Sequence, residues 1–201
     1  MNTTIYWVRH AKSPFSKENE RLRGLSPDGI ADAERVTEIL AQEQLEAVVS
    51  SPYTRAIQTV QGAAAELGLE MELEENLRER LLAGLDHVIE GEGFMAAIER
   101  VFTDQDYALP GGESNHAAQQ RGMEALQRVL NRHQGKRFAI GTHGNIMTIL
   151  MSNWDSEAYG LAFWKQISSP DIYKMTLDAE QKLVSVSRIW PANQQISPIN
   201  S

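Results

Sequence analysis

The sequence predicts an α/β protein, a three-layer sandwich with a mostly parallel central sheet, helices on both faces and a C-terminal β-hairpin. Short apolar runs alternate with helix-like segments over about the first 150 residues, which favours parallel strands joined by helical crossovers. The composition, 42% hydrophobic and 23% charged over 201 residues, is that of a globular chain.

The first strand and the first helix have the clearest signals. The β-branched and aromatic run at residues 5–8 predicts a buried strand that ends at Arg9 and His10. Ser26 is the predicted N-cap of a helix, with Pro27 at its first position and apolar residues at helical spacing after it. These apolar residues are Ile30, Ala33, Val36, Ile39 and Leu40.

The same pattern recurs further along the chain. Residues 47–49 predict a second strand, and Ser51 with Pro52 predicts the start of a second capped helix, which Gly68 stops. A weaker strand is expected at residues 71–73. The later elements are helices at 94–103, from Ser114 to near His133 and at 144–151, a strand at 138–141, and hairpin strands at 172–177 and 183–189.

One domain is expected over residues 1–190, followed by a mobile polar tail at 191–201. We find no signal peptide and no apolar run near the roughly 18 residues of a membrane span, so the cytoplasm is the expected location. The formal charge of −8 disfavours nucleic acid and anionic membranes as partners. The absence of cysteine excludes disulfides, thiolate metal sites and cysteine nucleophiles.

Polar residues follow three of the predicted strands, at the sheet edge where active groups of parallel sheets gather. Arg9 and His10 follow the first strand, Ser51 and Arg55 the second, and His143 the strand at 138–141. Histidine offers a neutral nitrogen nucleophile near pH 7, and arginine offers a fork of donors matched to phosphate oxygens. These residue types are those required for phosphoryl transfer without a metal.

Six segments, in this order, resemble the histidine phosphatase superfamily, also called the phosphoglycerate mutase-like family. They read VRHAKS at 8–13, LSPDG at 25–29, SPYTRAIQT at 51–59, LRER at 77–80, PGGES at 110–114 and THGN at 142–145. The resemblance spans residues 5–145 and agrees with the predicted α/β fold.

The resemblance implies a metal-independent phosphomonoester hydrolase with no cofactor and a small phosphorylated substrate. His10 would be the residue that is phosphorylated. Arg9, Arg55 and a protonated His143 would bind the phosphoryl group and offset its charge. Glu79 would protonate the leaving alkoxide and then deprotonate the water that cleaves the phosphohistidine.

Four further positions are candidates for substrate binding: Ser13, Ser16, Gly144 and Asn145. Ser16 stands where many members of the family carry an asparagine that contacts the phosphate, so Ser13 or Ser16 is a candidate replacement donor. Ala11 replaces the usual glycine after the histidine, which indicates that the backbone there does not require a positive φ.

The same core residues are also compatible with a phosphoglycerate mutase or with a non-catalytic phosphoryl-binding module. Mutases resemble one another in a long basic insertion after the catalytic glutamate, whereas residues 85–109 are short and contain Arg100 as their only lysine or arginine. Six acids occupy the same span, which disfavours a multiply charged phosphoglycerate and favours hydrolysis. They are Asp86, Glu90, Glu92, Glu99, Asp104 and Asp106.

Five apolar or aromatic residues of this span either line a leaving-group pocket or pack its helix on the core. They are Phe94, Met95, Val101, Phe102 and Tyr107. The Asp-x-Asp pair at 104–106 imitates another phosphatase motif, but it ends a predicted helix instead of following a strand and is interpreted as a solvated turn.

Overall fold

The computed structural model describes the chain except for residues 17–18, 85, 88, 90–92 and 192–201. Its strands are β1 (Thr3–Arg9), β2 (Ala47–Ser50), β3 (Met71–Leu73), β4 (Arg137–Thr142), β5 (Asp171–Leu177) and β6 (Leu183–Arg188). Its helices are α1 (Pro27–Ala41), α2 (Thr54–Glu66), the 3₁₀ turn η1 (Glu75–Leu77), α3 (Gly93–Thr103), α4 (Asn115–Arg132), α5 (Gly144–Met151) and α6 (Leu161–Gln166).

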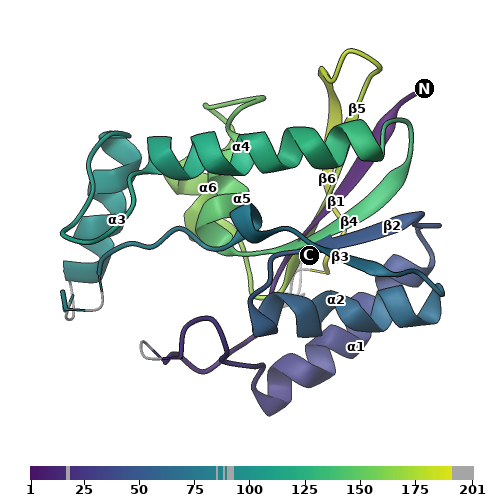
Figure 1. Cartoon of the computed structure of the whole chain (residues 1–201), viewed down its shortest axis with the longest axis horizontal. Coiled ribbons are helices and arrows are strands. Elements are labelled where there is room, and N and C mark those ends of the chain that lie inside the picture. The colour runs from purple at the N-terminus through teal and green to yellow at the C-terminus, as the bar shows by residue number, and fades with distance from the viewer. Residues whose placement is uncertain (17–18, 85, 88, 90–92, 192–201) are drawn as a thin grey trace, which may run out of the picture.

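The six strands form one sheet in the order β3-β2-β4-β1-β5-β6. The first four of these run parallel, and β5 and β6 join as an antiparallel pair at the side of β1. Helices α1 and α2 cover one face, and α4 and α5 cover the other (Figure 1). The predicted α/β class, parallel sheet and C-terminal hairpin are confirmed.

The sheet is apolar on both faces because helices cover both. Along β1, Ile5 and Trp7 pack with Leu126 of α4 in one buried cluster, while Tyr6 and Val8 pack with Val36 of α1 in the other. A strand buried on both sides is a continuous apolar run without alternation. This explains why β1 and β4 were recognisable from the sequence.

The predicted cap at Ser26 is confirmed, and Ser114, predicted as the opening of a helix, is also a cap. Ser26 Oγ accepts the Gly29 N–H at the start of α1, and Ser114 Oγ accepts the Ala117 N–H at the start of α4. The predicted cap at Ser51 is wrong, because α2 begins later, at Thr54, after a residue whose side chain makes no capping bond. The Ser51 hydroxyl contacts a histidine instead, as described below.

Residues near α3 pack against α6, a helix that was not predicted. The rings of Phe94 and Phe102 lie 6.5 and 6.3 Å from Trp164, and Val101 is fully buried. The Arg100 guanidinium lies 3.6 Å from the centre of the Tyr107 ring. Val101 and Phe102 therefore pack the helix on its neighbours, whereas Phe94 and Met95 remain exposed. The acids Glu90 and Glu92, and the predicted tail beyond Pro191, lie outside the described residues.

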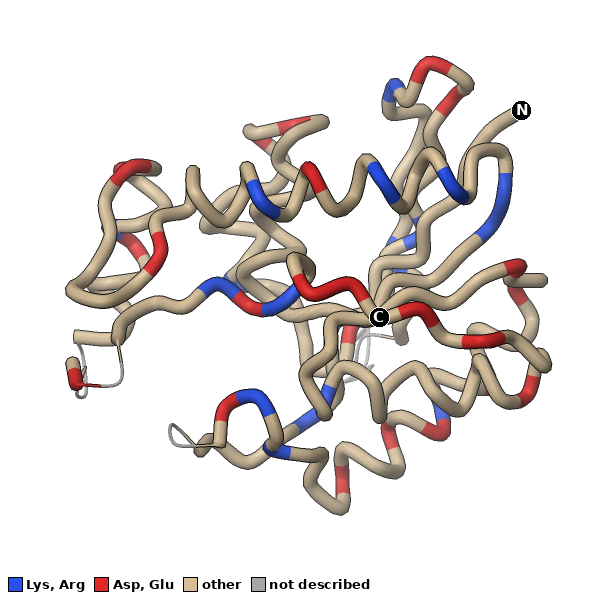
Figure 2. Tube along the Cα trace, in the orientation of Figure 1, with Lys and Arg blue, Asp and Glu red and all other residues tan. Residues whose placement is uncertain are grey.

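Charge is distributed unevenly between the two helical layers. Helix α1 carries mainly acids and α4 mainly arginines (Figure 2). These are Asp28, Asp32, Glu34 and Glu38 on α1, and Arg121, Arg128 and Arg132 on α4. No described helix is both long enough and apolar enough to cross a membrane.

Candidate active site

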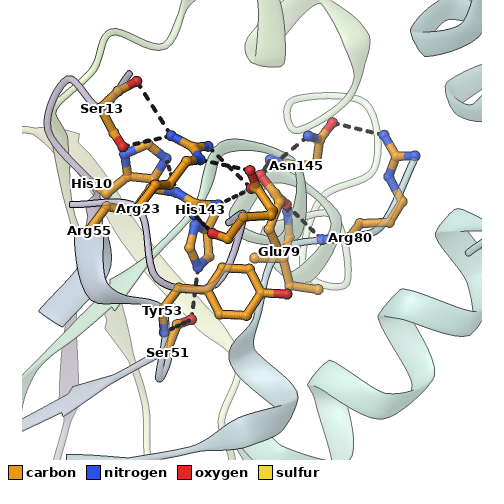
Figure 3. A network of polar contacts seen from close by, with 12 residues as sticks. His10, Ser13, Arg23, Ser51, Tyr53, Arg55, Glu79, Arg80, His143 and Asn145 are labelled. Carbon is orange, nitrogen blue, oxygen red and sulfur yellow. Dashed lines mark hydrogen bonds and ion pairs between the residues drawn. The ribbon is translucent and has the colours of Figure 1, made fainter. Parts of the chain in front are cut away.

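Three neighbouring strands bring the predicted polar residues together at their carboxyl ends. His10 follows β1, His143 follows β4 and Ser51 follows β2 (Figure 3). The ladder continues past the strand ends, because His10 N–H donates to Thr142 O at 2.9 Å and Ser51 N–H donates to Gly141 O at 2.8 Å. These backbone bonds fix the two histidines and Ser51 beside one another.

His10 presents a neutral ring nitrogen to the site. Its Nδ1 lies 2.7 Å from Ala11 O, a distance at which Nδ1–H donates to the carbonyl. Its Nε2 accepts a hydrogen bond from Arg55 Nε at 3.1 Å. Burial, followed by the charge of Arg55, lowers the His10 pKa well below 6.5. We therefore assign the unprotonated nitrogen to Nε2, the form that a nucleophile requires, with its lone pair hydrogen-bonded to Arg55 Nε in the free protein.

His143 is fully buried and lies edge-on to two rings, with centroids 5.3 Å from His10 and 5.1 Å from Tyr53. Its Nε2 is 2.8 Å from Ser51 Oγ, and its Nδ1 has no hydrogen-bond partner among the described residues. Burial, together with Arg55, lowers its pKa well below 6.5. This direction favours a neutral His143 in the free protein, whereas the expected protonated form concerns the site with a phosphoryl group bound.

Ser51 Oγ lies within hydrogen-bonding distance of His143 Nε2, and the direction of this bond depends on which ring nitrogen carries the proton. A Ser51 hydroxyl that donates to Nε2 leaves the proton of the neutral ring on Nδ1, next to the His10 ring. An Nδ1–H without a partner is available to an anionic oxygen. Ser51 was missed as a functional residue because Ser-Pro at a strand end is also the pattern of a helix cap.

Two backbone carbonyls hold the Arg9 guanidinium in place. Its Nη1 donates to Ile167 O at 2.9 Å and to Ser168 O at 3.2 Å, while its buried Nε has no partner among the described residues. A Cβ at Gly144 would lie 3.1 Å from that Nε. The glycine therefore allows the backbone at the start of α5 to approach the guanidinium closely.

Glu79 is bound by the start of α5. Its Oε1 accepts N–H bonds from Arg80 at 2.8 Å and from Ile146 at 3.0 Å. Its Oε2 accepts the backbone N–H of Asn145 at 3.2 Å and the side-chain Nδ2 at 3.3 Å. The first turn of a helix is a favourable place for a carboxylate. Asn145 therefore contacts Glu79 directly. The Oδ1 of Asn145 in turn accepts from Arg80 Nη2 at 3.0 Å.

A cleft of about 490 Å³ opens beside Glu79 and Tyr53. Its other lining residues are Arg78, Leu81, Asp106, Ala108, Gly112, Glu113, Ser114 and Ala117. Three of the lining residues are acids, and Asp106 is the one that comes from the acidic span near α3. None of the aromatic residues of α3 lines the cleft in the described part of the chain.

The two serine candidates lie in the loop after β1. Ser13 Oγ donates to Gly24 O at 2.7 Å and accepts from Arg23 Nη1 at 2.6 Å. Ser16 has no hydrogen bond to the His10 group within the described residues. Arg23 was missed because this polar loop has neither periodicity nor a strand end to mark it. Among the described residues, no three acids or histidines converge to hold a metal ion.

Comparison with known sequences gives one family. The sequence model of the histidine phosphatase superfamily, branch 1, matches residues 5–188. Phosphoglycerate mutase-like protein 4 of Arabidopsis thaliana is 34% identical over 158 residues, covering 73% of this chain and 68% of the relative. The metal-independent phosphoserine phosphatase of Arabidopsis thaliana is 30% identical over 157 residues, covering 72% and 66%. The chain spans about two thirds of these relatives.

Solved structures share the fold over nearly the whole chain. A mycobacterial glucosyl-3-phosphoglycerate phosphatase superposes with a TM-score of 0.72 at 17% identity, covering 94% of this chain and 98% of that one. A variant of the phosphoserine phosphatase from Entamoeba histolytica, in complex with phosphoserine, gives 0.70 at 19% identity, covering 92% and 96%. At these identities the likeness concerns the fold alone.

Proposed function

The chain belongs to the histidine phosphatase superfamily, and from this premise we propose that it is a metal-independent phosphomonoester hydrolase acting through a phosphohistidine at His10. The observation that carries the proposal is the state of His10. Its Nδ1 lies 2.7 Å from Ala11 O, which suits a proton on Nδ1, and its Nε2 accepts from Arg55 Nε at 3.1 Å, which places that guanidinium beside the nucleophilic nitrogen.

In the first step His10 Nε2 attacks phosphorus in line with the leaving oxygen. The N–P bond forms as the P–O bond breaks, and Glu79 gives a proton to the departing alkoxide. The imidazole becomes a cation as it takes the phosphoryl group. Ala11 O, already the acceptor of Nδ1–H, stabilises that charge.

In the second step water replaces the histidine at phosphorus. Glu79 takes a proton from the water, the O–P bond forms, the N–P bond breaks and His10 returns to its neutral state. Four donors to its two oxygens hold the Glu79 carboxylate in one orientation in both steps. Asn145 therefore acts as a positioning residue for Glu79.

Three groups stabilise charge on the transferring phosphoryl oxygens. Arg9 has a buried Nε without a partner in the described part of the chain, Arg55 carries a charged fork beside His10, and His143 has an unpaired Nδ1. Preorganised donors of this kind are typically worth about 3 kcal/mol each in a transition state. The neutral His143 acts as a hydrogen-bond donor and not as a second cation.

Hydrolysis is favoured over transfer to a second substrate by the charge of the cleft. Asp106 and Glu113 line it together with Glu79, and Arg78 is its only lining base among the described residues. Arg121 pairs with both oxygens of Glu113, so Asp106 is the lining acid that would repel a leaving group with several negative charges. The small phosphomonoester of a neutral or zwitterionic alcohol, as phosphoserine is of serine, suits this charge better than a phosphoglycerate does.

The decisive experiment is a phosphomonoester screen with His10→Ala beside the wild type. Removing the nucleophile should reduce turnover by at least about a thousandfold while leaving the circular dichroism spectrum unchanged. A phosphoprotein that is acid-labile and alkali-stable should form in the wild type and be absent from the variant. His116→Ala, a histidine with an exposed side chain, is the control and should keep wild-type turnover.

Wild-type turnover by the His10→Ala variant would end the proposal. A mutase assay with 3-phosphoglycerate and catalytic bisphosphoglycerate belongs beside the screen. Isomerisation faster than phosphate release would replace hydrolysis by mutase activity as the function of the site.

A further inference from the structure

An acidic side chain of the protein itself bridges two arginines next to His10. Glu20 Oε1 accepts from Arg55 Nη2 at 2.6 Å, and its Oε2 accepts from Arg23 Nε at 2.7 Å. Arg23 Nη2 also donates to Oε1 at 3.2 Å. The carboxylate of Glu20 thus binds a pair of guanidinium groups, one of which contacts the nucleophile.

A carboxylate held by two guanidinium forks is in a place that suits a phosphoryl group equally well. Both anions present oxygens to the same planar donors, and charge-assisted bonds of this kind are short and strong. The Arg55 side chain is only 1% exposed, so its donors have few alternatives. Glu20 and a phosphate dianion would compete for Arg55 Nη2 and would also repel each other.

Arg23 is itself firmly placed. Its Nη1 donates to Ser13 Oγ at 2.6 Å, and the Ser13 hydroxyl donates onward to Gly24 O at 2.7 Å. Only 13% of the Arg23 side chain is exposed. Figure 3 shows Arg23 alongside His10 and Ser13, with its guanidinium extended toward the centre of the site. Ser13 therefore holds Arg23 in position.

The Glu20 carboxylate can leave without unfolding the loop. Arg55 Nη1 donates to the Glu20 backbone oxygen at 2.6 Å, so the backbone has its own anchor on the same arginine. The Glu20 side chain is 29% exposed, which leaves it a route to solvent by side-chain rotation. Rotation would free donors on both Arg55 and Arg23 at once.

We propose that Arg23 is a third phosphate-binding arginine, and that Glu20 is an internal anion which the phosphoryl group of the substrate displaces. The inference rests on the proposed function and deepens it. Without ligand, Glu20 keeps the two cations paired. The apparent affinity for phosphate is lower than the intrinsic one by the fraction of molecules in which Glu20 has moved away.

The test is the binding of inorganic phosphate measured by titration calorimetry in a phosphate-free buffer. Glu20→Gln should tighten phosphate by about tenfold or more, because the competing charge is removed. Arg23→Gln should weaken phosphate by about tenfold, because a charge-assisted contact is lost. In the double variant the gain from Glu20→Gln should largely disappear. In steady-state kinetics with a phosphomonoester substrate, Glu20→Gln should lower KM more than it changes kcat.

The neighbouring pair of Arg21 and Glu75 supplies a matched control. Arg21 donates to both oxygens of Glu75 at 2.7 Å, at the surface of the same loop. Glu75→Gln removes the same charge from a similar bidentate pair and should leave phosphate affinity unchanged. An equal gain in Glu75→Gln would indicate a general charge effect and would overturn the inference.

Two further outcomes separate the inference from the proposed function. Hydrolysis by the wild type together with unchanged or weaker phosphate binding in Glu20→Gln would make Glu20 a support for Arg55, and the inference alone would fail. The inference also fails if Arg23→Gln binds phosphate as the wild type does. A folded wild type that neither hydrolyses monoesters nor binds phosphate would refute the proposed function, and the inference with it.

Discussion

At the scale of single residues, Ser51 has a role that its sequence context disguised. Its hydroxyl lies 2.8 Å from His143 Nε2, and both side chains are fully buried. A neutral imidazole has one donor and one acceptor nitrogen, and the partner of one decides the role of the other. A Ser51 hydroxyl that donates to Nε2 would make Nδ1 the donor that faces the phosphate-binding groups.

Replacing Ser51 by alanine should therefore weaken catalysis by about tenfold to a hundredfold, which corresponds to the 1–3 kcal/mol of a buried polar group left without its partner. We expect the affinity for inorganic phosphate to fall with kcat/KM, because the wrong tautomer of His143 offers no donor. Steady-state kinetics with phosphate inhibition measures both quantities.

Ser50→Ala is the matched control for that variant. Ser50 is equally buried and its hydroxyl donates to Ser51 O at 2.8 Å, but it contacts no histidine. Equal losses of phosphate affinity in the two variants would show that Ser51 acts only through local packing.

At the scale of elements, the start of α5 serves both halves of the site. Its backbone N–H groups bind Glu79, and its first residue, Gly144, lies against Arg9. One helix start thereby sets the distance between the proton-transfer group and a phosphate-binding arginine. A side chain at position 144 changes that distance without removing any functional group.

Gly144→Ala should therefore reduce phosphate affinity and kcat/KM by about tenfold, because the new methyl lies 3.1 Å from Arg9 Nε and forces the guanidinium to shift. The free energy of unfolding should change little, since alanine favours the helix by up to about 1 kcal/mol and offsets the crowding. Steady-state kinetics with phosphate inhibition measures kcat/KM and phosphate affinity. Urea titration of the same preparation measures the free energy of unfolding.

Gly93, the first residue of α3, supplies a matched control for Gly144→Ala. A Cβ at Gly93 would meet its nearest neighbour, Ile89 Cγ2, at 3.6 Å, an ordinary contact. Gly93→Ala should leave phosphate affinity unchanged. If Gly144→Ala behaves in the same way, the close approach to Arg9 has no functional meaning.

The elements differ in how well the sequence predicts them. Strand β1 and helix α1 follow from local rules, since a run buried on both faces and a Ser-Pro cap each leave a direct pattern. Helix α6 does not, because six residues are too few to show a helical period, although Phe163 and Trp164 pack against the core. The polar loop that holds Glu20 and Arg23 likewise has no periodicity. Its arrangement depends on Arg55, which lies far away in the sequence.

At the scale of the whole molecule, two histidines link stability to pH. The pKa values of His10 and His143 lie well below 6.5 in the folded protein, chiefly because both rings are buried. In the unfolded chain each takes up a proton near pH 6.5. Below that pH the unfolded state binds more protons than the folded state, so stability is complete above it and decreases as the pH falls.

The free energy of unfolding should therefore decrease between pH 6.5 and 5.5 with a slope of up to about 1.4 kcal/mol per pH unit for each histidine. Urea titrations at a series of pH values, in buffers without phosphate, measure this slope. In His10→Asn the slope should be about half that of the wild type. An unchanged slope would mean that His10 takes up protons equally in both states.

The protonation state of His143 shows why a site cannot be completed from motifs. The sequence places this histidine correctly after β4, but its charge depends on burial and on Arg55, and neither is visible locally. In the same way, the net charge of −8 describes the whole surface and gives no information about the arginines at the strand ends.

The position of β4 has a consequence for how the protein is made. This strand lies between β2 and β1 in the sheet, although it is the fourth strand to leave the ribosome. Until it emerges, the edges of β1 and β2 that pair with β4 present unpaired backbone N–H and C=O groups. The growing chain therefore carries His10 and Arg55 through most of its synthesis without a pocket. The two histidines come together only when Arg137–Thr142 inserts and brings His143 with it, and Arg9 gains its carbonyl partners, Ile167 O and Ser168 O, later still.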